Sequence, residues 1–323
     1  MSASLRVGFV SASCRLSCRQ ANEQKWDNVV FRNAWYGLAF LKGDVGDMVE
    51  QQKWYASQSD YENWGLSLQS DTEAFYGLLG KARELTKRAE ESGIRADSKE
   101  SAGIWDENAA IREAAFGNLA EAKTVAASGV RLAPTSQSVD VEAGLAYAMA
   151  GDTARAEIMA QDLNQRFPLD TQVQKLWVPA IRAQVALERK NPKAAIEALQ
   201  PASGSLELAQ IFFVANLSCL YPTYVRGEAY LADNDGKSAA AEFQKIVDND
   251  GIVWNCWTGA LAKLGLARAN ALQAKTLRAG LQAAEADLAR TRAAYKDFLA
   301  LWKDADPNIP ILKEAKADYL KLQ

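Results

Sequence analysis

The sequence predicts an all-α fold, a right-handed α-solenoid of about seven helical hairpins closed by a C-terminal capping helix. Two observations lead to this prediction. From about Asn28 onward, apolar residues and alanines recur at intervals of three and four, and no alternating run of useful length indicates a strand. Small and aromatic residues also recur at a longer fixed interval, which is the signature of a repeat architecture.

The clearest repeat lies between residues 139 and 170. Gly144 is followed by Tyr147, Gly151, Ala156 and Pro168 at offsets of 3, 7, 12 and 24 residues. In a helical hairpin the small residues let helices approach closely, Tyr147 fills the space between hairpins, Gly151 turns the chain and Pro168 ends the unit. Two further copies contain Gly227, Tyr230, Ala239 and Phe243, and then Leu264, Gly265, Ala267, Tyr295, Phe298 and Pro307.

These residues resemble the tetratricopeptide repeat, and the resemblance extends over about residues 28–322. The segments LYPTYVRGEAYLA from Leu220 and GALAKLGLARA from Gly259 are similar to the repeat region that follows the kinase domain in acidobacterial-type serine/threonine protein kinases. No glycine-rich phosphate loop, HRD or DFG motif precedes the repeats, so the resemblance implies no kinase activity. It implies a scaffold whose concave face binds a protein or peptide.

The pattern divides the chain into a leader and one repeat domain. Residues 1–26 are expected to be a poorly ordered leader, because their apolar patch is too short for a secretory signal. Cys14 and Cys18 have no second pair and no histidine to complete a metal site. Residues 27–323 are expected to form the solenoid, with an irregular insertion at 200–220 and an extended helix at 273–295.

The predicted extended helix carries an apolar stripe. Its members are Leu277, Leu281, Ala284, Leu288 and Tyr295, which are spaced four, three, four and seven residues apart. A stripe of this kind packs on a neighbouring helix or on a second chain. The sequence therefore leaves open a homodimer that forms through residues 273–295.

Composition narrows the function further. With 40 carboxylates, 37 Lys and Arg and no long basic block, the chain has no nucleic-acid footprint. Its apolar stretches fall short of the ~20 residues that span a bilayer. The absence of His excludes Ser-His-Asp and Cys-His catalysis and HExxH metalloproteolysis. We therefore expect a non-enzymatic protein with no cofactor and no metal.

Near Asp233 a calcium loop is disfavoured, because Leu231 stands where its first carboxylate belongs.

Aromatic and polar residues of the later repeats are candidates for the peptide-binding wall. First helices of such hairpins line the inner side of the superhelix, where aromatic side chains anchor an extended peptide. The alternative is that these aromatic residues belong to the core, as is usual at helical spacing. The candidate residues are Tyr221, Tyr224, Glu228, Trp254, Trp257 and Asn270.

Two cysteines are expected to be neighbours. Cys219 and Cys256 stand eight and nine residues before Gly227 and Gly265, so stacking of the repeats brings them to one level on adjacent first helices. They are either free buried thiols or a disulfide. A cytoplasmic location agrees with free thiols, and an extracytoplasmic one with a disulfide.

An enzymatic alternative is an all-α glycoside hydrolase. Helical hairpins can close into a ring in which two carboxylates about 5–9.5 Å apart cleave a glycosidic bond. An open spiral would favour the scaffold, and a closed ring with facing carboxylates would favour the enzyme. Candidate acids are Glu73, Asp106, Glu107 and Glu113, with Trp64 and Trp105 as sugar platforms.

Overall fold

In a computed structural model the chain is an all-α solenoid, and the structure describes residues 28–208, 219–276 and 281–322. Within these ranges there are sixteen α-helices, labelled α2 to α17, and no strand, which confirms the predicted fold class. The seven hairpins are α2 (Val29–Lys42) with α3 (Val45–Ala56), α4 (Glu62–Phe75) with α5 (Leu79–Arg95), α6 (Lys99–Ala115) with α7 (Leu119–Leu132), α8 (Gln137–Met149) with α9 (Thr153–Arg166), α10 (Val178–Glu188) with α11 (Pro192–Ala198), α12 (Tyr221–Ala232) with α13 (Gly236–Asp248), and α15 (Trp257–Thr276) with α16 (Leu281–Leu301).

Shorter elements lie between the hairpins and at the end of the array. They are the π-helix η1 (Val173–Trp177), the 3-10 helix η2 (Gly204–Leu208), the short α14 (Asp250–Val253) and α17 (Pro310–Leu320), the predicted capping helix. No helix in the described part of the chain is both long and apolar enough to cross a bilayer.

The turn at Gly151 shows why the hairpins repeat at a fixed interval. Gly151 has a φ of 78°, which allows its N–H to donate to the carbonyl of Ala148 at 3.0 Å. The N–H of Asp152 donates to the carbonyl of Tyr147 at 2.9 Å, and together these bonds close the end of α8. The carboxylate of Asp152 then accepts from the N–H of Arg155 at 3.2 Å and caps α9.

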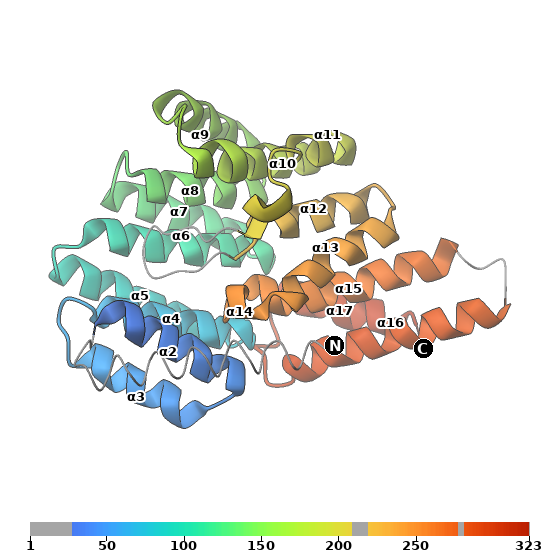
Figure 1. Cartoon of the computed structure of the whole chain (residues 1–323), viewed down its shortest axis with the longest axis horizontal. Helices are drawn as coiled ribbons and strands as arrows, with labels where there is room; N and C mark the ends of the chain where they lie inside the picture. Colours follow the sequence, from blue (N-terminus) through green and yellow to red (C-terminus); the bar gives the residue numbers. More distant parts are fainter. Residues whose placement is uncertain (1–27, 209–218, 277–280, 323) are drawn as a thin grey trace.

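The hairpins form two layers that curve round on themselves. Helices α4, α6, α8, α10, α12 and α15 form an inner series in which each helix contacts the next, with α5, α7, α9, α11, α13 and α16 outside them. In Figure 1 the chain rises from α2 to α9, turns over at α10 and α11, and returns through α12 and α13. Because α15 contacts α4, the inner series closes into a ring.

A set of contacts that we call the closing seam joins the two ends of the array. Trp254 has its ring against Gly37 of α2, where no side chain would fit. The side-chain amide of Asn255 donates to the carbonyl of Leu68 at 2.8 Å and to the hydroxyl of Thr72 at 3.0 Å, both on α4. These residues are more than 180 positions apart in the sequence, so the seam is a tertiary contact and not a neighbour contact of the repeat.

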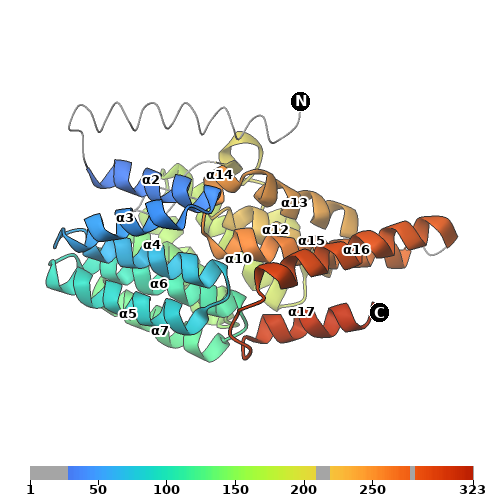
Figure 2. The same ribbon diagram turned by 90° about the horizontal axis from the view of Figure 1, so that it is seen from below.

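The seam continues along the loops that follow α16. The indole N–H of Trp302 donates to the carbonyl of Phe75 at 2.9 Å. Asp306 accepts from the N–H of Gly80 at 2.6 Å, and its own N–H donates to the carbonyl of Gly77 at 2.9 Å. The first turn of α5 is therefore capped by a residue from the other end of the chain. Figure 2 shows the segment between α16 and α17 passing beside the first helices of the array.

Repeat glycines mark close contacts, as the sequence predicts. A Cβ on Gly227 of α12 would lie 2.8 Å from the Phe243 ring of α13, and one on Gly265 of α15 would lie 2.6 Å from the same ring. A Cβ on Gly144 would meet Ile181 of α10 at 2.7 Å and Met159 of α9 only at 3.7 Å, so the tight contact of this glycine is with the next hairpin and not with the second helix of its own.

The predicted extended helix at 273–295 is wrong. Helix α15 ends at Thr276 and α16 begins at Leu281, and the two helices pack as a hairpin. Tyr295 is buried on α16, so this end of the stripe packs inside the chain. The leader and residues 209–218 of the insertion lie outside the described residues; part of the insertion is η2.

Candidate functional site

Three of the predicted binding residues lie together in an aromatic cluster between α12 and α15. The Tyr221 ring lies 5.6 Å from that of Trp177 and 5.9 Å from that of Trp257, and Tyr224 lies 4.9 Å from Trp257. Tyr221, Tyr224 and Trp257 are only 5%, 8% and 4% exposed. The structure therefore places them in the core of the inner layer.

The other three predicted residues are partly buried, and among them Glu228 adjoins the cluster through a side-chain hydrogen bond with Tyr224. Trp254 packs on Gly37 in the closing seam, and its indole N–H donates to the carbonyl of Gly251 at 2.9 Å. Burial raises the pKa of Glu228, and the charge of Arg268 opposes that increase. Asn270 lies further along α15. The six residues therefore do not form one open surface.

Cys219 and Cys256 are brought together as the repeat spacing predicts. Their Cα atoms are 5.6 Å apart and their sulfur atoms form a disulfide. Cys219 precedes α12, and Cys256 directly follows Asn255 of the closing seam. The bridge therefore links the start of α12 to the segment that holds α4.

A buried group of charged residues, which we call the ring charges, lies where α4, α6 and α8 meet. Arg112 is 1% exposed and pairs with Asp71 at 3.1 Å. It also donates to the hydroxyls of Ser70 at 3.3 Å and Thr86 at 3.2 Å. Glu142 lies nearby on α8, and within the described structure its Oε2 atom has no hydrogen-bond partner.

Burial perturbs the protonation of these groups. It raises the pKa of Asp71 to about 6, although the positive charge of Arg112 opposes the increase. It raises the pKa of Glu142 well above its ordinary value, and the charge of Asp71 adds to that increase. None of these three residues was among those predicted from the sequence. One signal for their burial was available. Asp71, Arg112 and Glu142 all lie on the first helix of a hairpin, and such a helix packs against neighbouring helices on both of its faces.

The acids proposed for hydrolysis take part in different contacts. Glu113 accepts two hydrogen bonds from Arg83 of α5, at 2.7 and 2.8 Å. Asp106 is buried, and its pKa is raised to about 7 by burial and by Glu90 of α5. Glu107 is buried beside Gly129 of α7. Glu73 is half-buried on α4, and the rings of the two proposed sugar platforms, Trp64 and Trp105, are 6.4 Å apart.

Near the disfavoured calcium loop, Asp235 has a structural role. Its carboxylate accepts from the N–H of Ser238 at 3.0 Å and caps α13. Among the residues that the structure describes, no three His, Cys, Asp or Glu side chains gather in a way that could hold a metal ion.

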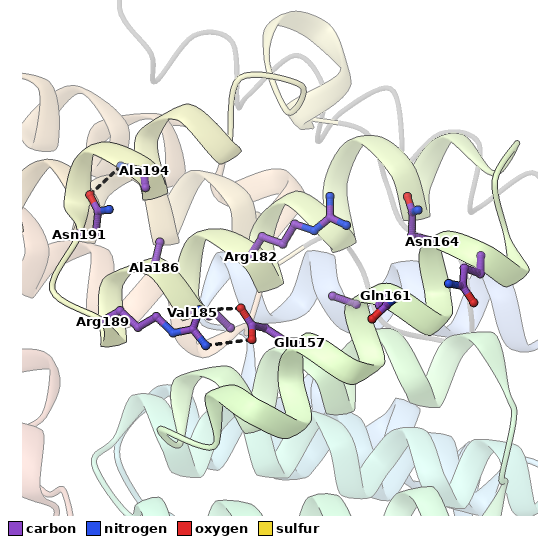
Figure 3. Close-up of a pocket in the computed structure, with 11 residues that line it drawn as sticks. Glu157, Gln161, Asn164, Arg182, Val185, Ala186, Arg189, Asn191 and Ala194 are labelled. Carbon is purple, nitrogen blue, oxygen red and sulfur yellow. Dashed lines mark hydrogen bonds and ion pairs between the residues drawn. The ribbon is translucent and has the colours of Figure 1, made fainter.

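An open groove, here called the α9–α10 groove, lies on the outside of the ring between α9, α10 and α11 (Figure 3). It has a volume of about 760 Å³. One end is crossed by a pair of bonds from Arg189 to Glu157, at 2.6 and 2.9 Å. Its apolar residues are Ala160, Val185, Ala186 and Ala194, and its other polar residues are Gln161, Asn164, Gln165, Arg182 and Asn191.

The short length of α11 opens this groove. Helix α11 has 7 residues, whereas the outer helices on either side, α9 and α13, have 14 and 13. Asn191 caps α11 by accepting from the N–H of Ala194 at 3.2 Å, and Pro192 occupies its first position. Because α11 ends after two turns, no outer helix among the described residues covers part of the surface of α9 and α10.

Comparison with solved structures gives more than one match, among them a weak likeness to a yeast protein. The crystal structure of the yeast Tom70 matches with a TM-score of 0.48 and 12% identity over 92% of this chain. The match covers 64% of that chain, so this protein spans less than two thirds of its length. No protein-family model and no curated protein sequence matches. The array of helical hairpins itself fits a tetratricopeptide-like protein, and the resemblance to kinase-associated repeats stays a prediction.

Proposed function

We propose that this protein is a non-catalytic scaffold that binds a segment of another protein. The observation that carries the proposal is the α9–α10 groove, which combines helical walls, an apolar floor and a rim of amide and guanidinium groups. Helices that are already packed form this surface, so little conformational entropy is lost when a partner binds.

The inner face remains a second proposed binding surface. Tyr221, Tyr224 and Trp257 contact one another there, so a peptide could stack on these rings only if the aromatic cluster opened. The groove needs no such rearrangement. For this reason we place the main binding surface on the outside of the ring.

Site-specific photo-crosslinking tests the proposal. A photoreactive amino acid at Ala186 reports on the groove, one at Asn270 reports on α15, and one at Ile94, which is 40% exposed on α5, is the control. The scaffold predicts a crosslinked protein at Ala186 or Asn270 that is absent at Ile94 and is competed away by unlabelled chain. Identical products at all three positions would refute it.

A hydrolase is the second candidate, and two observations support keeping it. The inner helices close into a ring, and Asp71 and Glu142 keep protons at higher pH than ordinary carboxyl groups, as a general acid requires. Against this role, Asp71 is engaged by Arg112. Release of reducing sugar from mixed polysaccharides by the wild type, lost in Glu142→Gln, would support the enzyme. No release from any of these substrates would count against it.

A further inference from the structure

We infer that the α9–α10 groove binds an acidic helical segment of a partner protein, with Arg182 as the charged anchor. The inference rests on the proposed scaffold function and adds the chemistry of the partner. Three features of the groove support it: the shape of its walls, the size of its floor residues and the balance of its charges.

The walls have the geometry of a seat for a third helix. The α9 wall presents Glu157, Ala160, Gln161, Asn164 and Gln165, which follow the three- and four-residue spacing of one helix face. The α10 wall presents Arg182, Val185, Ala186 and Arg189 in the same spacing. Two helix faces side by side form a trough into which the side chains of another helix pack.

Within the described residues, the outer layer has only the short α11 at this place. Every other hairpin between α4 and α13 has an outer helix of at least 13 residues, and α11 has 7. A helical segment of about two turns would span roughly 11 Å and continue the layer where α11 stops. The floor residues Ala160, Ala186 and Ala194 are small, so the partner supplies the larger apolar side chains.

The charge of the groove selects an acidic partner. Glu157 and Arg189 neutralise each other through their two bonds. Arg182 is exposed and forms no ion pair with any residue in the described ranges, so the groove carries one uncompensated positive charge in a chain of net charge −3. In Figure 3 its side chain extends toward the Asn164 end of the groove, away from the Glu157–Arg189 pair.

An acidic side chain on the bound helix would form a charge-assisted pair with this guanidinium. The amides of Gln161, Asn164 and Gln165 can donate and accept beside it. A basic helix would bring a like charge to Arg182, which is unfavourable. The groove therefore discriminates by charge as well as by shape.

The test uses two fluorescein-labelled amphipathic helical peptides and the full chain. Both peptides carry Leu and Ala on one face, with Glu on the other face in the first peptide and Lys in the second. By fluorescence anisotropy, the acidic peptide should bind in a saturable manner, and Arg182→Glu should weaken it by about tenfold or more. Arg88→Glu makes the same charge change on outer helix α5 and should leave the affinity within about twofold.

A steric variant provides a readout that does not depend on charge. Ala186→Trp fills the floor and should weaken the acidic peptide by about tenfold, with helical circular dichroism unchanged. Equal binding of the acidic and basic peptides would overturn the inference, as would equal losses in Arg182→Glu and Arg88→Glu, or full binding by Ala186→Trp. Self-association of the chain that Arg182→Glu abolishes would also overturn it, because a second copy would then occupy the groove.

The scaffold proposal can survive the failure of this inference. If the photoreactive residue at Asn270 captures a specific partner and the peptides fail to bind, the groove assignment is wrong and the scaffold stands. If neither Ala186 nor Asn270 captures a specific partner, the scaffold itself is wrong.

Discussion

Around α12, α13 and α15 aromatic rings make the closest contacts between helices, beside one buried ion pair of Arg226 with Glu242, whereas around α4, α6 and α8 several charged groups are buried together. In the first region, which we call the aromatic side, Phe243 lies against Gly227 and Gly265, and a disulfide joins the helix starts. In the second, the charged side, Arg112 pairs with Asp71 and Glu142 is buried beside them.

Both sides have the same hairpin geometry, so the repeat does not require one kind of interior. Close packing of rings on glycine is sensitive to lost volume, whereas buried carboxyl groups are sensitive to pH. We therefore expect the two sides to respond to different perturbations, and the following experiments measure how separate they are.

The largest effect is expected for Phe243→Ala on the aromatic side. The ring is fully buried and packs against two helices, so its removal should lower the free energy of unfolding by about 3–5 kcal/mol. Urea unfolding followed by circular dichroism measures the change. Phe243→Leu is the control and should cost clearly less. A loss below about 1 kcal/mol for Phe243→Ala would show that the cavity collapses and that this side is not tightly packed.

Loss of the disulfide should have the next largest effect. The bridge closes a sequence separation of 37 residues, so Cys219→Ser with Cys256→Ser should cost about 2–4 kcal/mol. Hydrogen exchange should increase in α12 and α15 and stay unchanged in α7. An equal increase in all helices would show that the two sides unfold as one unit. A non-reducing mass measurement before the experiment establishes that the wild-type bridge is formed.

The charged side should lose stability as pH rises. Burial raises the pKa of Asp71 to about 6, and burial together with Glu90 raises the pKa of Asp106 to about 7. Unfolded Asp titrates near about 3.9, so between these values the folded state holds more protons than the unfolded state. Stability from these groups is therefore fully present at low pH and falls as pH rises from about 4 to 7. The melting temperature should be higher at pH 5 than at pH 8.

Asp106→Asn tests the origin of this pH dependence. An amide cannot ionise, so the decline in melting temperature between pH 5 and pH 8 should be smaller than in the wild type. Glu157→Gln is the matched control, because Glu157 lies on the surface and its pKa is lowered by Arg189. If Asp106→Asn leaves the slope unchanged, other groups cause the decline.

The smallest effect is expected in the closing seam, which connects the two sides. Asp306→Ala removes the cap that the C-terminal part provides to α5 and should cost about 1 kcal/mol. Asp152→Ala removes a cap within one hairpin and serves as the comparison. Thermal unfolding measures both. A loss much larger for Asp306→Ala than for Asp152→Ala would show that the seam couples the two ends cooperatively.

The hairpins could be predicted from the sequence because their causes are local. Gly151 must adopt a positive φ, and Asp152 caps α9 directly before the first residue of that helix. The proximity of Cys219 and Cys256 could be predicted from the repeat interval, because each stands at nearly the same distance before the glycine of its repeat. The division of residues 273–295 between α15 and α16 was not predicted, because the apolar stripe keeps its helical spacing across both helices.

The closing seam and the burial of the predicted binding residues could not be predicted in this way. The bond from Asn255 to Leu68 depends on the summed curvature of all the hairpins between them. Each contact between neighbouring hairpins adds a small part of that curvature. The same curvature places Tyr221 and Trp257 in the core. The groove did have a local signal, because Pro192 and Pro201 leave room for only a short helix between them.

The contact between Asn255 and Leu68 also has a consequence during protein synthesis. The two residues are 187 positions apart, which at cellular rates of elongation corresponds to a delay of roughly 10–40 s. During that time the nascent chain exposes the side of α4 that α15 later covers. The ribosome-bound protein is therefore expected to need protection of this surface by a chaperone until the last hairpin emerges.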